Sequence, residues 1–185
     1  GGNFGAVVAI ELELLPIPDV QAGFLLWDIS AAPAVLAAWR DATQAADAGG
    51  STGGLADRAA TTTLRMLRFP PVPELPPFLS GRSLVIVDGA ILADDERAAS
   101  LLAPLRALQP EIDTFTRFPS AAVLDVHMDP PAPTPAVGDH AMLVPLDDGA
   151  LAALLAVAGP GASDAPMIVE ARQLGGALTE PHDAA

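Results

Sequence analysis

The sequence predicts an α+β fold with one mostly antiparallel sheet, built from split β-α-β units, and helices packed on one face. After a first strand, strand-like and helix-like segments follow one another as β-α-β, β-α-β and α-β-α-β. The 185 residues suffice for one domain with a substantial core, and 51% of them are hydrophobic, which excludes a disordered chain. Since no apolar stretch approaches the roughly 18 residues of a membrane span, we expect a soluble domain.

The first part of the chain is predicted to form two strands and a helix. Residues 6–15 alternate aliphatic residues with glutamate, which is typical of a half-buried strand, and residues 20–27 form the second strand. Ser30 is a candidate N-cap, and the glycines at 49–50 end the helix. Four residues share the predicted buried face of this helix: Val35, Leu36, Trp39 and Ala42.

The middle of the chain is predicted to contain two strands and a second helix. Residues 61–69 and 83–92 are strand-like, and residues 70–77 are so rich in proline that we expect a stiff surface connector rather than a ligand for a proline-binding module. A helix from about Asp94 presents its buried stripe at Ala98, Leu101, Leu102, Leu105 and Leu108.

The last part repeats the alternation of elements. Residues 111–118 are predicted to be extended and 120–128 to form a short helix. A strand over 140–145, a helix over 148–158 and a strand over 166–173 follow. With all helices on one face, the other face of the sheet is expected to be free of helices and available to cover another group.

Composition narrows the chemistry that the chain can perform. It contains no cysteine, lysine or tyrosine, which excludes disulfides, thiolate metal sites, Schiff-base lysines and tyrosine bases. The net charge of -14 argues against nucleic acid and anionic membranes as partners. We expect a cytoplasmic protein.

Glycines at the start of the chain allow two interpretations. Gly1, Gly2 and Gly5 would let the backbone approach a phosphate or a ring closely. In dinucleotide-binding loops, however, such glycines follow a strand and open a helix, whereas these precede a strand. Spacing alone therefore favours a structural turn over a dinucleotide loop.

Read together, several segments resemble the FAD-linked oxidases of the vanillyl-alcohol-oxidase superfamily, and within it the bacterial berberine-bridge-enzyme-like oxidoreductases. The resemblance covers nearly the full chain and depends on the order and spacing of its segments rather than on one motif. These segments are 1–8 (GGNFGAVV), 22–27, 38–41, 68–73 (RFPPVP), 104–106, 113–114, 127–130 (HMDP) and 172–178 (RQLGGAL).

The resemblance implies a two-domain enzyme that transfers a hydride from a small-molecule substrate, such as an alcohol, an amine or a sugar-like hydroxyl compound, to FAD, which oxygen reoxidises. Residues 1–15 would be the end of the FAD-binding domain, and 16–185 a substrate-binding domain truncated at its C-terminus. We expect a fragment without catalytic residues of its own, which should be inactive alone. The residues implied to contact FAD are Gly2, Asn3, Gly5 and Val7.

Two charged residues near the C-terminus are candidates for the substrate pocket. Glu170 and Arg172 are two apart on a predicted strand, so they share a face and could orient a substrate. The alternative is a surface ion pair, which stabilises little. Gln173 follows where the resembling family usually has histidine, so a ring-nitrogen role there is lost.

Other polar residues have simpler interpretations. His127 and Asp129 could ligate a metal, but no third ligand lies at a suitable spacing, so we predict no metal site and favour a role in fixing the loop. Arg65 and Arg68 either line the mouth of the pocket or occupy solvated strand positions.

A function of another class also fits the pattern. A stand-alone ferredoxin-like binding or dimerisation module would pair its free sheet face with another copy, giving a homo-oligomer. On either hypothesis the isolated domain is expected to expose a broad apolar sheet face and to self-associate.

Overall fold

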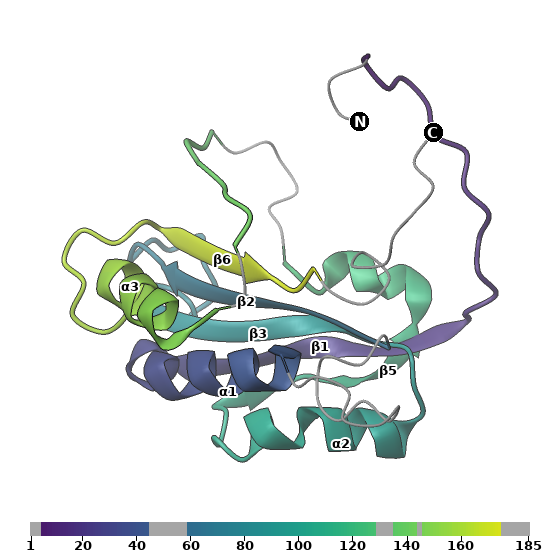
Figure 1. The fold of residues 1–185 in the computed structure, drawn as a ribbon, viewed down its shortest axis with the longest axis horizontal. Coiled ribbons are helices and arrows are strands. Elements are labelled where there is room, and N and C mark those ends of the chain that lie inside the picture. Colours follow the sequence, from purple (N-terminus) through teal and green to yellow (C-terminus); the bar gives the residue numbers. More distant parts are fainter. Residues whose placement is uncertain (1–4, 45–58, 129–134, 144–145, 175–185) are drawn as a thin grey trace.

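The computed structural model describes residues 5–44, 59–128, 135–143 and 146–174. One antiparallel sheet runs through these residues, in the order β4-β1-β3-β2-β6, and β5 also pairs with β1 (Figure 1). The strands are β1 (Asp19–Asp28), β2 (Ala60–Arg68), β3 (Ser83–Ile91), β4 (Ile112–Asp113), β5 (Thr116–Pro119) and β6 (Ile168–Arg172). The helices are α1 (Ala32–Gln44), α2 (Asp95–Arg106), α3 (Asp148–Ala158) and the short 3-10 helices η1 (Ile29–Ala31) and η2 (Ser120–Asp125).

The connections between strands confirm the predicted split β-α-β units. Helix α1 connects β1 to β2, and β3 lies between these two strands and is antiparallel to both. Helix α2 connects β3 to β4 and β5, and β1 lies between them. This is the β-α-β-β-α-β topology of ferredoxin-like domains, to which α3 and β6 add a further unit at the β2 edge. The predicted α+β class is confirmed.

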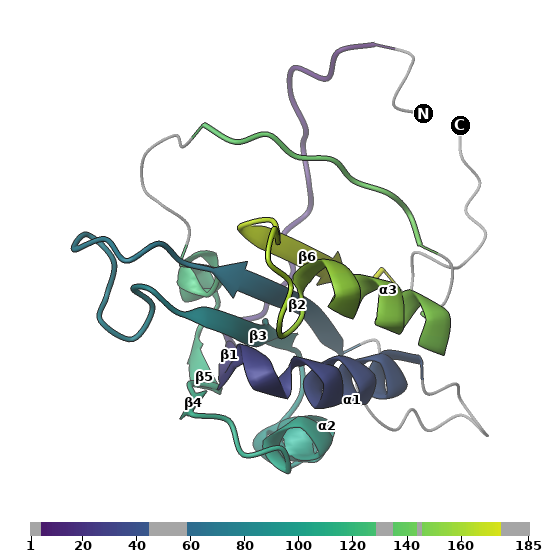
Figure 2. The same ribbon diagram turned by 90° about the vertical axis from the view of Figure 1, so that its left-hand side faces the viewer.

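One face of the sheet, here called the helical face, is covered by α1, α2 and α3 (Figure 2). Period-two alternation directs Leu25 and Val85 from the central strands towards the helices. All four residues predicted for the buried face of α1 are buried. Each large apolar side chain buried in this layer contributes roughly 1.5–3 kcal/mol relative to exposure. Ser30, the predicted N-cap, lies inside η1, and the side chain of Asp28 caps η1 by accepting a hydrogen bond from Ser30 N.

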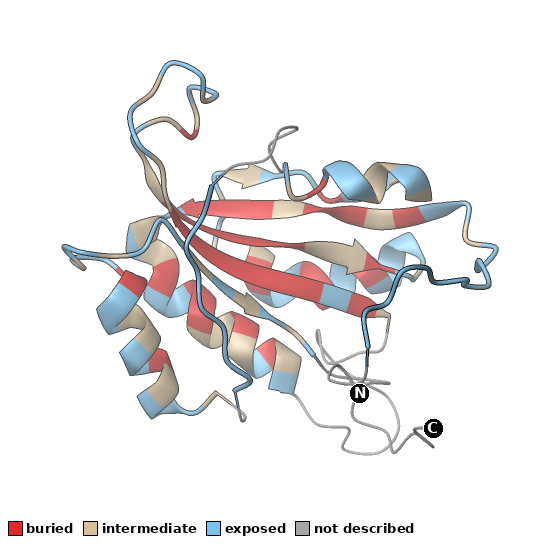
Figure 3. Ribbon diagram, turned by 90° about the horizontal axis from the view of Figure 1, so that it is seen from above, coloured by how far each residue is buried: buried red, intermediate tan, exposed pale blue. Residues whose placement is uncertain are grey.

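The opposite face, here called the second face, differs from the expectation of a free and broadly apolar surface. The loop after β2 turns back over one end of the face, where Leu79 packs against Leu67, Leu84 and Ile86. Helix η2 covers the other end, where a second small cluster forms around Val126. Most residues of the central strands are consequently buried on both faces (Figure 3). The expectation fails because the loop after β2 and the segment around η2 both carry apolar residues that pack against the sheet.

Two predicted strands do not form. Residues 6–15 are irregular and exposed, with Val8 96% accessible, and residues 140–143 are likewise exposed and outside any strand. Alternation alone does not make a strand, because the backbone groups also need a neighbouring strand, and none pairs with either segment among the described residues. Residues 144–145 and the glycines at 49–50 lie outside the described part of the chain. Within that part, no helix is long and apolar enough to cross a membrane.

Candidate functional site

A fully buried carboxylate lies near the centre of the second face. Asp88 on β3 is 0% exposed, and its neighbours in register are Phe24 on β1 and Thr63 on β2. Because successive strand residues point to opposite faces, Val87 faces the helices and Asp88 faces away from them. A buried aspartate requires partners, since an isolated charge in the interior is very costly.

Arg65 supplies the first partner of this carboxylate. Its guanidinium is buried on β2, and Nη2 contacts Oδ2 of Asp88 in an ion pair. Nη1 donates a hydrogen bond of 3.3 Å to the backbone carbonyl of His127. One arginine thus connects the central strands to the segment that follows η2.

His127 supplies the second partner. Its Nδ1 lies 3.5 Å from Oδ2 of Asp88, while its side chain is 40% exposed. The backbone on both sides of it is fixed. Val126 is buried against the sheet, and Met128, at a φ of 52°, donates from its N–H to the carbonyl of Asp125 at 3.1 Å. The imidazole therefore bridges a buried carboxylate and solvent.

The electrostatics of Asp88 reflect these neighbours. Burial raises the pKa of the carboxyl above its ordinary value of 3.8, Arg65 and His127 oppose the rise, and Glu170 adds to it. Its Oδ1 has no hydrogen-bond partner among the described residues. An unsatisfied buried acceptor costs about 1–3 kcal/mol, and such groups concentrate at functional sites.

The predicted pocket residues belong to this same group. Glu170 on β6 is opposite Arg65 in register, so it lies on the second face, and its carboxylate forms an ion pair with Nε of Arg172. The side chain of Arg172 is 69% exposed and that of Glu170 is 25% exposed. We define the polar cluster as Arg65, Asp88, His127, Glu170 and Arg172. The position of Glu170 and Arg172 is compatible both with the edge of a pocket and with a surface ion pair.

Other sequence candidates lie elsewhere. The side chain of Arg68 points to the helical side, where its Nη2 donates to the carbonyl of Gly159 at 2.9 Å, so Arg68 does not line a pocket on the second face. Gln173 accepts a hydrogen bond from Thr62 Oγ1 at 2.9 Å, also on the helical side. Asp129, the proposed companion of His127, lies outside the described residues.

The residues implied to hold FAD are partly outside the structural description. Gly2 and Asn3 belong to the residues that it omits. Gly5 has open space where a Cβ would be, and Val7 is 77% exposed. Both positions lie in the irregular, exposed segment before β1.

The sequence analysis missed Asp88, the residue around which the cluster is built. The available signal was one acidic residue inside the otherwise uncharged, strongly strand-forming run of residues 83–91. Such a residue on a strand buried on both faces has to find a partner in the interior. The sequence alone could not identify that partner as Arg65.

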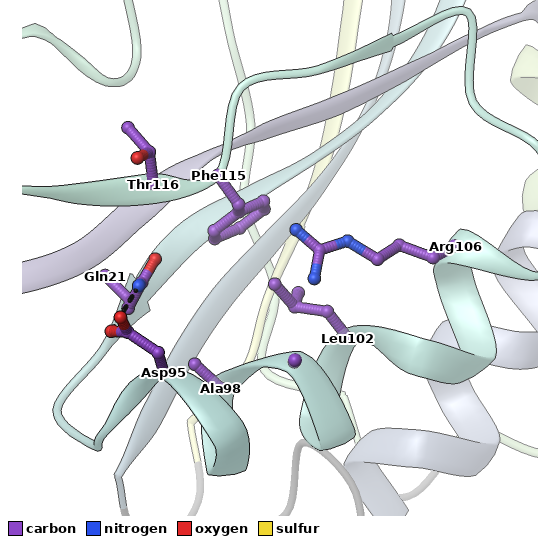
Figure 4. Close-up of a pocket in the computed structure, with 8 residues that line it drawn as sticks. Gln21, Asp95, Ala98, Leu102, Arg106, Phe115 and Thr116 are labelled. Carbon is purple, nitrogen blue, oxygen red and sulfur yellow. Dashed lines mark hydrogen bonds between the residues drawn. The ribbon is translucent and has the colours of Figure 1, made fainter.

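A concavity lies away from the polar cluster, between α2 and β5 (Figure 4). Gln21 donates a hydrogen bond of 2.8 Å to Asp95 across one end, and Arg106 is paired with Asp113 at the other. Because its charged residues are paired and exposed, this groove shows no comparable sequestered reactive group.

No group of three or more histidine, aspartate or glutamate side chains is arranged to hold a metal ion in the part of the chain that the structure describes. Comparison of the chain with models of protein families and with curated proteins found no match.

Proposed function

We propose that this chain is the substrate-binding part of an FAD-dependent oxidoreductase, with residues 1–15 as the end of the FAD-binding domain and residues 16–185 as the substrate domain. The observation that carries the proposal is the polar cluster, in which a buried carboxylate and guanidinium adjoin a half-exposed imidazole on the face turned away from the helices. Perturbed ionisable groups of this kind are typical of sites that bind and convert small molecules.

The chain's own residues would bind and orient an alcohol, an amine or a sugar-like substrate. Glu170 and Arg172 form the more exposed part of the polar cluster, and Oδ1 of the buried Asp88 has no hydrogen-bond partner among the described residues. FAD would contact the backbone at Gly5 and Val7 together with Gly2 and Asn3, as the family resemblance implies. Bound FAD supplies the hydride acceptor, which none of the side chains present can provide.

The absorption spectrum of the natural reading frame that contains this chain tests the proposal. We expect the purified product to be yellow, with a flavin band that is bleached by substrate in the absence of oxygen and restored by oxygen. The 185-residue chain produced alone should be colourless. A correctly folded but colourless product of the whole reading frame, which also fails to take up added FAD, would refute the proposal.

The location and partners of the protein follow from the same proposal. A cytoplasmic enzyme acting on a small molecule suits a chain without cysteine, and a net charge of -14 disfavours nucleic acid as a ligand. The FAD domain of the same chain would be its principal structural partner.

One observation favours a second candidate, a binding or dimerisation module without catalysis. Strand β6 is an edge of the sheet among the described residues, and three apolar residues on or beside it, Met167, Ile168 and Leu174, are each at least half exposed. Edge pairing between two copies would cover them. Sedimentation should then show a dimer that Ile168→Lys dissociates, and a monomer at all accessible concentrations would exclude this candidate.

A further inference from the structure

His127 differs from an ordinary surface histidine in what lies beneath it. Its Nδ1 is 3.5 Å from a carboxylate oxygen of Asp88, a residue with no exposed surface, while the side chain itself remains 40% exposed. A carboxylate at one ring nitrogen fixes the tautomer and leaves the other nitrogen free to accept a proton. This 3.5 Å contact is longer than an ordinary hydrogen bond, and the hydrogen bonds of catalytic groups often tighten only when a ligand binds.

We propose that Asp88 and His127 form an acid–base dyad, in which Nε2 of His127 removes a proton from a hydroxyl or ammonium group of a ligand bound on the second face. The inference deepens the proposed function and rests on it for the class of ligand. The O–H or N–H bond of the ligand breaks, its electron pair stays on the oxygen or nitrogen, and a new N–H bond forms at Nε2. His127 is the catalytic residue of this step, and Asp88 is a positioning residue.

The surroundings of the imidazole support this division of roles. Arg65 pairs with Asp88 and also binds the backbone carbonyl of His127, so one side chain fixes the distance between the two members of the dyad. The turn that carries His127 is held against the sheet, because the neighbouring Val126 is buried in the core.

Charged groups on three strands lie at the dyad. Arg65 comes from β2, Asp88 from β3 and Glu170 from β6, where Glu170 is itself paired with Arg172. Arg65, His127 and Glu170 are thus the charged or ionisable groups around the Asp88 carboxyl. The dyad thus has a carboxylate at its buried end and solvent at its reactive end.

The tautomer of His127 tests the inference without any flavin. The chain is labelled with ¹⁵N-histidine, and its imidazole resonances are recorded at a pH where the rings are neutral. We expect His127 to be mainly protonated at Nδ1, with Nε2 unprotonated. His140, which is exposed and far along the chain from η2, serves as the internal comparison and should show the Nε2–H form of free imidazole. His127→Gln and His140→Gln assign the signals.

Asp88→Ala should return His127 to the tautomer of His140. If that variant does not fold, the wild-type tautomer decides alone. An Nε2–H tautomer for His127 in the wild-type chain, or an unchanged Nδ1–H tautomer in folded Asp88→Ala, would overturn the inference.

The rate of chemical modification provides a second readout. A histidine with a purely structural role would show no increase in this rate. Diethyl pyrocarbonate acylates unprotonated imidazole nitrogens, so we expect His127 to react several-fold faster than His140, and Asp88→Ala to remove the difference. Equal rates in the wild-type chain would contradict a reactive Nε2. The two proposals fail separately, because a colourless reading frame refutes the flavin proposal and leaves the tautomer result standing, whereas an Nε2–H tautomer refutes the dyad alone.

Discussion

On the helical face of the sheet the buried side chains are apolar except for Thr62, whereas the second face buries Thr63, Arg65 and Asp88 near its centre. The two faces belong to the same strands, so chain connectivity does not explain the difference. The helical face is covered by three helices whose apolar stripes fill it. Among the described residues, the loop after β2 and η2 cover the two ends of the second face.

This difference separates the parts of the sheet that stabilise it from the part that carries reactive groups. Apolar burial on the helical face contributes favourably throughout. A buried ion pair contributes little net stability, because the cost of desolvating the two charged groups offsets the attraction between them. The Arg65–Asp88 pair is therefore better explained by function than by folding, and the comparison can be tested by changing one face at a time.

The largest effect is expected from removing one member of the buried pair. Arg65→Met leaves the Asp88 carboxylate buried without its main partner, which should lower the free energy of unfolding by about 3–5 kcal/mol at neutral pH. Denaturant titration followed by circular dichroism measures the change. Arg172→Met is the matched control, because Arg172 is 69% exposed and an exposed pair stabilises by at most about 1 kcal/mol. Equal losses in the two variants would contradict a special role for the buried pair.

An intermediate effect is expected on the helical face. Trp39 Nε1–H donates to Thr62 Oγ1 at 3.0 Å in the core, so Thr62→Val removes the acceptor and should cost about 1–3 kcal/mol. Thr61→Val is the control, since Thr61 is exposed on the second face and the change should stay within about 0.5 kcal/mol. If both variants lose the same stability, the assignment of faces is wrong.

The smallest effect is a dependence on pH. Because the pKa of Asp88 is raised above 3.8 in the folded chain, the folded state holds this proton more tightly than the unfolded state does. The resulting stability is fully present below pH 3.8 and is lost as the pH rises through the raised pKa. Asp88→Asn cannot ionise, so its free energy of unfolding should rise relative to wild type across that window. A difference that does not change with pH would show that the carboxyl is not perturbed.

The elements that the sequence predicted correctly are those with strong local patterns. The buried stripe of α1 and the acidic start of α3 were readable from spacing, as was the sequence of alternating elements that determines the split β-α-β topology. Residues 6–15 were misassigned because their alternation is real but no neighbouring strand pairs with them.

The candidate site was less accessible to sequence reasoning. Glu170 and Arg172 were found because residues two apart on a strand share a face. For Arg65 the sequence left a pocket mouth and a solvated strand position open and did not predict burial, because its burial depends on Asp88, 23 positions away in sequence, and strand register determines that contact. The helix predicted over 120–128 ends at Asp125, so His127 lies in the turn that follows, and its proximity to a buried carboxylate depends on how η2 packs over β1.

The claim that the buried charges are kept for function rather than for stability is tested most directly by removing both. The measurement is the free energy of unfolding of the double variant Arg65→Met, Asp88→Leu, in which apolar side chains of similar size replace the pair. We predict a value equal to that of the wild-type chain or higher by up to about 4 kcal/mol, because no buried charge remains. A loss as large as that of Arg65→Met alone would show that the pair holds the fold together and would contradict the claim.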